Sequence, residues 1–179
     1  GLRLGFLSKN HFKNRNNRIS LPVILTACLF LASVFCYITF SASSRAQAER
    51  IVKKLFTSES YRELEEAANI GLPQMYDTHF PGDFTPEGRD SLLPVGIPYT
   101  LFLEQFPSPV ERIYAQEPVL ALEEESGKTV RYRYTVETEF YLERRLEEVS
   151  PVVQKSFTGT ITLKKTGFLK WKMEAFTAG

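Results

Sequence analysis

Few residues of this chain have the type and spacing that catalysis or metal binding requires. Residues 45–179 contain one histidine, His79, and no cysteine, and the nearest carboxylate to it in the sequence is Asp77. A structural or catalytic metal site needs three or four ligands, which this pair does not supply. A Ser/His/Asp site would need His79 as its base, but no serine lies in a G-x-S-x-G motif. We therefore predict a surface position for His79, with no catalytic residue, metal site or cofactor.

The other candidate residues belong to one long alternating segment, Lys128–Leu142. Alternation with a period of two predicts a strand with one buried and one solvent-facing side. Tyr132, Tyr134 and Phe140 fall on the buried side and form a candidate ligand pocket. That side carries no Asp or Glu that could act as a base, so packing of the tyrosines in a core is the favoured interpretation. The buried side comprises Val130, Tyr132, Tyr134, Val136, Thr138, Phe140 and Leu142.

This strand needs partners on both of its edges. The segment Val110–Glu123 is expected to pair with it across a turn at Glu125–Lys128. A second hairpin is predicted from Ser156–Lys164 and Phe168–Phe176, with its turn at Lys165–Gly167. Together these segments predict a four-stranded antiparallel meander.

Gly159 lies inside one strand of the second hairpin. A glycine within a strand often marks a bulge or a bend, and such features curve a sheet.

Helices are expected before the strands. The segment Ala46–Phe56 has apolar residues at helical spacing, and Tyr61–Ile70 and Tyr99–Phe106 are two further predicted helices. The five prolines between Leu72 and Pro98 exclude long regular elements, so this region is expected to be mostly ordered loop with short helical turns. The apolar stripe of the first helix comprises Ala48, Ile51, Val52 and Leu55.

An uncharged segment, residues 19–44, precedes this domain. Its centre, Leu21–Phe40, would be about 30 Å long as a helix, which matches the hydrocarbon core of a bilayer. A buried core helix and a cleaved signal peptide, with a cleavage sequence at Ala46–Ala48, are the alternatives to an uncleaved anchor. We favour the anchor, with Leu21, Phe30 and Phe40 among its membrane-facing residues, because the apolar run is longer than a signal peptide requires.

The distribution of charge predicts the orientation of this anchor. Residues 1–18 carry five basic side chains and no acidic one, whereas residues 45–179 have a net charge of −4. The positive-inside rule therefore places residues 1–18 in the cytoplasm and the C-terminal domain outside it. Nucleic-acid binding is disfavoured because the domain is acidic overall. No N-x-[ST] sequon occurs, so glycosylation gives no indication of a eukaryotic protein. A bacterial single-pass plasma-membrane protein is the simplest interpretation.

The opening helix AERIVKKLF, the long strand TVRYRYTVETEFYLE and the closing segment SFTGTITLKKTGFLKWKMEAF together resemble the nuclear-transport-factor-2-like (cystatin-like) superfamily. The resemblance covers about residues 45–177. It implies an α+β fold: a cone of three helices packed on a curved four-stranded antiparallel sheet, here following a transmembrane helix. The expected division is a cytoplasmic head at 1–18, a transmembrane helix at 19–43 and an extracytoplasmic domain at 44–179.

The order of basic head, membrane span and exported cone also resembles the VirB-type assembly factors of type IV secretion and their conjugative-transposon counterparts. That resemblance implies a non-enzymatic scaffold that self-associates and contacts other subunits of a membrane complex, with the lipid bilayer as a further partner. The alternative is a small-ligand-binding or isomerase-like cone, since some relatives with this fold are isomerases that use an Asp base and a Tyr donor. A core filled by Trp171, Met173 and phenylalanines would favour the scaffold.

Overall fold

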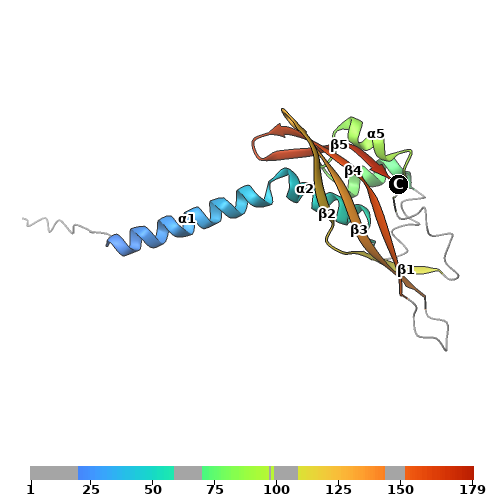
Figure 1. The fold of residues 1–179 in the computed structure, drawn as a ribbon, viewed down its shortest axis with the longest axis horizontal. Helices are drawn as coiled ribbons and strands as arrows, with labels where there is room; N and C mark the ends of the chain where they lie inside the picture. Colours follow the sequence, from blue (N-terminus) through green and yellow to red (C-terminus); the bar gives the residue numbers. More distant parts are fainter. Residues whose placement is uncertain (1–19, 59–69, 97, 99–108, 144–151) are drawn as a thin grey trace, which may run out of the picture. The chain divides into compact units, whose positions relative to one another are not determined.

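The computed structural model describes residues 20–58, 70–96, 98, 109–143 and 152–179. The chain divides into two compact units, residues 1–37 and residues 38–179. In the first unit, residues 21–37 belong to α1 (Leu21–Ser41), and the second unit is an α+β domain (Figure 1). The basic segment 1–18 and the helices expected at Tyr61–Ile70, apart from Ile70 itself, and at Tyr99–Phe106 lie outside the described residues.

The domain is built on one curled antiparallel sheet. Its long central strands are β3 (Thr129–Leu142) and β4 (Val152–Gly167), and β5 (Lys170–Ala178) pairs with the far side of β4. The alternation expected for β3 is confirmed, because all seven residues of its predicted buried side, from Val130 to Leu142, are buried. The α+β fold class is therefore confirmed.

The edge of β3 opposite β4 differs from the expectation, which was a single strand over Val110–Glu123. Two strands, β1 (Val110–Ala115) and β2 (Val119–Ser126), pair in succession with β3, so the sheet has five strands in four positions. The break includes Pro118, which has no N–H to donate to a ladder. The turn from β2 to β3 is at Gly127–Lys128, where Gly127 has a φ of 59°.

The second hairpin forms, but its turn is not at Lys165–Gly167. β4 continues to Gly167, and the turn consists of Phe168 and Leu169, the latter with a φ of 52°. An irregularity in the register between Lys165 and Gly167 accommodates one extra residue on β4. Turn composition did not predict this, because large apolar residues are unusual in tight turns.

Three described helices belong to the domain. α2 (Ser44–Leu55) confirms the first predicted helix, and its stripe of Ala48, Ile51, Val52 and Leu55 is buried. The proline-rich region contains two short helices, α4 (Leu72–His79) and α5 (Pro86–Leu92), with Pro73 and Pro86 in their first turns. Proline is tolerated there because the first N–H groups of a helix have no intrahelical partner. The region is thus more helical than expected.

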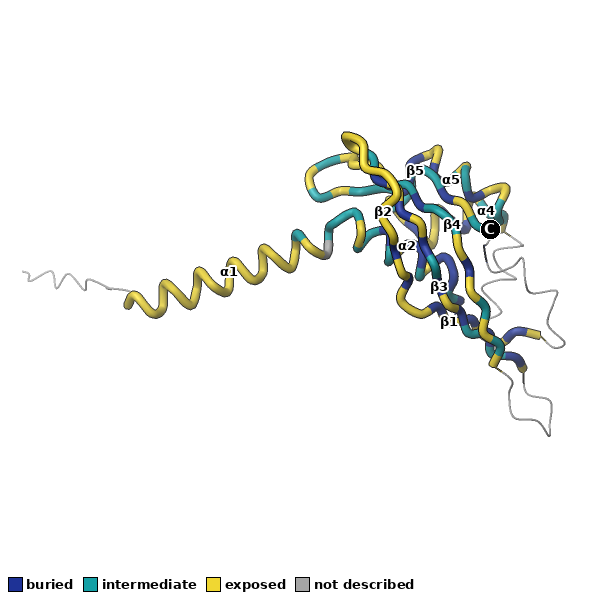
Figure 2. Tube along the Cα trace, in the orientation of Figure 1, coloured by how far each residue is buried: buried dark blue, intermediate teal, exposed yellow. Residues whose placement is uncertain are grey.

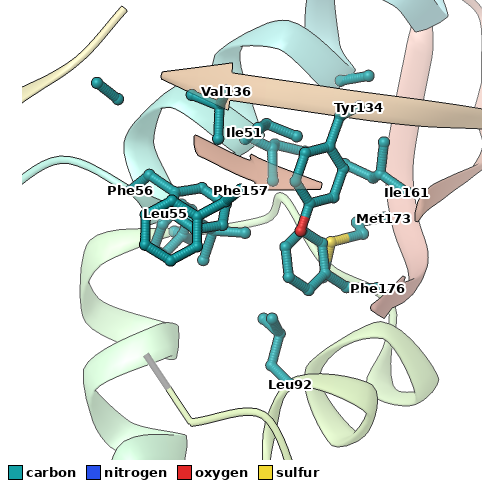
Figure 3. Close-up of a cluster of buried hydrophobic side chains, with 14 of the residues drawn as sticks. Ile51, Leu55, Phe56, Leu92, Tyr134, Val136, Phe157, Ile161, Met173 and Phe176 are labelled. Carbon is teal, nitrogen blue, oxygen red and sulfur yellow. The ribbon is translucent and has the colours of Figure 1, made fainter. Parts of the chain in front are cut away.

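The concave side of the sheet and these helices enclose the core. Ile51 and Phe56 contribute from the α2 segment, Tyr134 and Val136 from β3, and Leu92 from α5 (Figure 3). Figure 2 shows the resulting contrast, with dark-blue positions alternating along the central strands and a yellow surface along α1. The chain therefore combines a packed domain with a helix whose residues 21–38 are exposed.

Candidate functional site

The apolar surface of α1 is the most distinctive functional feature of the described chain. Leu21, Phe30 and Phe40 are 70%, 68% and 74% exposed, and Leu21–Phe40 is long and apolar enough to cross a membrane. None of the most apolar part of this span is buried within the protein. A helix that is apolar on every side needs an apolar environment around it. The interpretation as a buried core helix is therefore wrong.

The polar side chains of α1 are compatible with that environment. The hydroxyl of Thr26 donates to the carbonyl of Pro22 at 2.8 Å, and the hydroxyl of Ser33 donates to the carbonyl of Leu29 at 2.8 Å. Such bonds to the preceding turn satisfy each hydroxyl donor within the helix. A lipid environment would thus not leave these two donors without a partner.

The proposed signal-peptide cleavage sequence at Ala46–Ala48 lies inside α2. Ser43 caps this helix by accepting a hydrogen bond from the Ala46 amide at 3.2 Å, and Ala48 is fully buried. The Arg45 guanidinium donates to the Leu120 carbonyl at 2.8 Å. Cleavage after Ala48 would remove these contacts from the folded domain. This arrangement favours an uncleaved anchor over a signal peptide.

Tyr132, the first member of the candidate pocket, lies on the buried side of β3. Its hydroxyl is hydrogen-bonded to the hydroxyl of Ser44 at 2.8 Å, at the start of α2, and the residue is 6% exposed. The bond links the point where the chain enters the domain to the centre of the sheet. Tyr132 therefore has a clear structural contact.

Tyr134 lies deeper in the core. Its ring stacks on Phe176 with centroids 5.3 Å apart and is tilted against Phe56 at 5.8 Å. Its hydroxyl donates to the Thr177 carbonyl at 2.8 Å, and burial raises the pKa of the phenol. A neutral, bonded phenol of this kind contributes to packing and is not available as an acid or base near neutral pH.

Phe140 is fully buried and packs against Phe157 at a centroid distance of 6.4 Å. The structure thus places the three candidate pocket residues on one side of β3. Aromatic partners occupy space beside the rings of Tyr134 and Phe140, and both tyrosine hydroxyls are bonded within the domain. Met173 and Phe176 are buried in the same core, whereas Trp171 is only partly buried at its rim.

His79 and Asp77 are not brought together as a catalytic pair. His79 ends α4, and its carbonyl accepts a hydrogen bond from the Lys54 ammonium, while Asp77 forms an ion pair with Arg89 at 3.3 Å. A pocket of about 180 Å³ lies beside Asp77 and Arg89. Within the described residues, no group of three His, Cys, Asp or Glu side chains could hold a metal ion.

The acidic run Glu123–Glu125 lies on β2. The Arg133 guanidinium donates a hydrogen bond to the Glu123 carboxylate at 2.6 Å. Arg131 forms ion pairs with Glu123 at 3.3 Å and with Glu124 at 2.8 Å. These cross-strand pairs form a solvent-facing network of opposite charges. Such surface pairs contribute little to stability and carry no chemistry of their own.

The outer edge of β5 is covered by the segment that leads into α5. The Thr85 amide donates to the Met173 carbonyl at 2.9 Å, and the Met173 amide donates to the Asp83 carbonyl at 2.8 Å. The Phe176 amide donates to the Ser91 hydroxyl at 3.0 Å. Covering an edge strand in this way prevents its uncontrolled pairing with another chain.

One surface feature was missed by the sequence analysis. Phe168 is 81% exposed at the tip of the β4–β5 hairpin, between Gly167 and Lys170. The sequence signal that could have indicated this exposed tip is the pair Phe168–Leu169, which follows Gly167 and is flanked by lysines.

The chain matches no protein-family model and no curated protein sequence. It is similar to two solved structures. One is the periplasmic domain of DotI, with 14% identity and a TM-score of 0.47 over 75% of this chain and 91% of that one. The other is a periplasmic fragment of TraM, with 14% identity and a TM-score of 0.42 over 75% of this chain and 93% of that one. At this level of identity the likeness concerns the fold.

Proposed function

We propose that this protein is a membrane-anchored, non-enzymatic scaffold of a bacterial cell-envelope machine. α1 crosses the plasma membrane once, residues 1–18 lie in the cytoplasm, and residues 44–179 form the extracytoplasmic domain. The observation that carries this proposal is the helix Leu21–Phe40, which has no charged residue, is long and apolar enough to cross a membrane, and is followed directly by a domain with its own core. The machine is a conjugative or type IV secretion complex, in which the domain contacts other copies of itself and other subunits.

The filled core supports a role in assembly over a role in binding a small ligand. An isomerase-like or ligand-binding cone needs open space beside a polar group in its apolar interior. Around Tyr134 that volume is occupied by Phe56 and Phe176, and the hydroxyl is already bonded. No carboxylate lies on the buried side of β3. The alternative function therefore has no specific observation in its favour.

Topology is tested with reporters fused after Gly179. A reporter active only outside the cytoplasm should report activity, and a reporter active only inside it should not. The reason is the excess of basic residues before Leu21, since such residues are retained on the cytoplasmic side. The opposite pattern would contradict the proposed orientation. Recovery of a mature chain that begins at Glu49 would contradict the uncleaved anchor.

The scaffold assignment is tested by complementing a deletion strain in a transfer assay. The double variant His79→Ala/Tyr132→Phe should remain functional, because it removes the domain's imidazole and one phenol hydroxyl but keeps the packed ring. A general acid or base would instead lose about 10²–10⁴-fold in rate. Replacing Leu21–Phe40 by a cleavable signal should abolish function while the domain is still exported. A dispensable anchor together with a dead double variant would contradict the proposal.

A further inference from the structure

The tip of the β4–β5 hairpin has the composition of a membrane-binding surface. Phe168 projects into solvent with 81% of its surface exposed, and Lys165 and Lys170 are exposed on either side of the turn. Trp171 is partly buried next to them, with the Lys165 ammonium 5.9 Å from the centre of its ring. Aromatic residues combined with lysines are typical of segments that lie at the headgroup level of a bilayer.

The charge around this tip is mainly positive. The Lys165 amide donates to the Lys128 carbonyl at 2.7 Å, so the β2–β3 turn adds its lysine to the same end of the sheet. Lys172 follows Trp171 on β5, and Lys164 pairs with Glu174 at 3.1 Å. The other nearby carboxylates are Glu125 on β2, Glu124, which pairs with Arg131 at 2.8 Å, and Glu87, which interacts electrostatically with Lys164. Positive charge therefore exceeds negative charge here, although residues 45–179 as a whole are acidic.

The tip also lies at the end of the domain where the chain enters from α1. Ser44, the first residue of α2, contacts Tyr132 on β3, and Tyr132 is paired with Ile161 on β4. From Ile161 the hairpin continues for seven residues to Phe168, about 20 Å at the rise of a strand. Figure 1 shows the β4–β5 turn on the side of the domain where α2 begins. An anchored domain would thus keep this tip within reach of the bilayer.

We propose that the β4–β5 tip, Lys164–Lys172, docks on the anionic surface of the membrane that anchors the chain. Phe168 enters the headgroup layer, Trp171 lies at its boundary, and the lysines contact lipid phosphates. This inference rests on the proposed anchoring, because α1 would hold the tip close to the bilayer. The contact of the tip with lipid would be a second attachment of the domain, in addition to α1. Two attachments to the same membrane would restrict the orientation of the domain more than a single attachment does.

The test uses the full chain in lipid nanodiscs, with Trp171 as an internal probe because it is the single tryptophan of the protein. Discs rich in phosphatidylglycerol or made of phosphatidylcholine are prepared with brominated acyl chains, which quench a tryptophan at the membrane interface. We expect strong quenching of Trp171 in the anionic discs and weaker quenching in the zwitterionic ones. Added salt should reduce the quenching, because it screens lysine–phosphate attraction.

Three variants identify the groups responsible. Lys165→Gln/Lys170→Gln should lower the ratio of docked to undocked domain roughly 25-fold in anionic discs, since each lysine near such a surface contributes about fivefold. Phe168→Ser should reduce quenching in both kinds of disc. Val119→Ser, at a 69% exposed position on β2, is the matched control and should leave quenching unchanged.

The outcomes separate this inference from the proposed function. Co-elution of the chain with the discs tests the anchor, whereas quenching of Trp171 tests the tip. A chain that co-elutes but shows no quenching in anionic discs would overturn the docking proposal alone. Quenching that is unaffected by Phe168→Ser and by the lysine changes would overturn it as well. Loss of transfer function in Phe168→Ser without quenching of the wild-type chain would identify the tip as a protein contact instead.

Discussion

Replacing Gly159 by alanine should strongly destabilise the domain. A Cβ at this position would lie 2.0 Å from the Thr177 carbonyl oxygen, 2.5 Å from the Tyr134 hydroxyl and 2.8 Å from the carbon that bears it. Because non-bonded contacts of a Cβ below about 3 Å do not occur in folded proteins, β5 or the Tyr134 ring would have to move by about 1 Å. Either movement disturbs the bond from Tyr134 to Thr177, which is 2.8 Å long.

The magnitude follows from two contributions. Overpacking of a well-packed core typically costs about 1–3 kcal/mol, and losing the buried hydrogen bond adds about 0.5–1.5 kcal/mol. We therefore expect Gly159→Ala to lower the free energy of unfolding by about 2–4 kcal/mol. For a chain of this size, each kcal/mol lowers the Tm by roughly 2–4 °C.

The assay is thermal unfolding of the full chain in mild detergent, followed by the fluorescence of Trp171. The matched control is Gly167→Ala in the same strand, where the added Cβ would lie 3.5 Å from the nearest atom, a side-chain carbon of Lys170. That distance is an ordinary van der Waals contact, so the Tm should change little. Removing the hydroxyl in Gly159→Ala/Tyr134→Phe should restore little stability, because the Thr177 contact remains. A Tm for Gly159→Ala equal to that of Gly167→Ala would refute the reasoning.

Three further outcomes are expected. Burial raises the pKa of Tyr134, so its neutral form stabilises the fold fully below the unfolded pKa of about 10, and this contribution is lost as the pH rises beyond it. Tyr134→Phe should therefore lower the free energy of unfolding by about 1 kcal/mol near neutral pH. As the pH is raised above about 10, the Tm of this variant should fall less than the Tm of the wild type. An equal fall in the two proteins would contradict this expectation. Thr85→Ala should cost about 1–2 kcal/mol in thermal unfolding, because the Thr85 hydroxyl accepts from the Gly88 amide at 3.0 Å and donates to the Met173 carbonyl at 3.2 Å. The exposed Thr78→Ala change in α4 is its control and should cost much less. Trp171→Ala should cost less than the about 3–5 kcal/mol typical of a buried tryptophan, since Trp171 lies at the rim of the core. Chemical unfolding followed by circular dichroism checks this, with Met173→Ala as the fully buried comparison.

The sequence by itself determined the features that depend on local periodicity. The uncharged run predicted α1, because a run of twenty mostly apolar residues is recognisable without knowledge of any contact. The helical spacing of Ala48 to Leu55 predicted the buried stripe of α2, and the alternation from Val130 to Leu142 predicted the buried side of β3. In each case one face of the element is buried, so the apolar pattern is visible within the segment itself.

The tertiary structure alone decided the features that depend on contacts between distant segments. Gly159 pairs in regular register with Tyr134 and forms no bulge with β3, since its missing side chain leaves room for the Tyr134 ring and the Thr177 carbonyl. The shift of the hairpin turn to Phe168–Leu169 follows from the register of β4 with β5. The bonded hydroxyls of Tyr132 and Tyr134 likewise depend on residues 88 and 43 positions away. Such arrangements leave no periodic pattern, because each is set by a partner from another part of the chain.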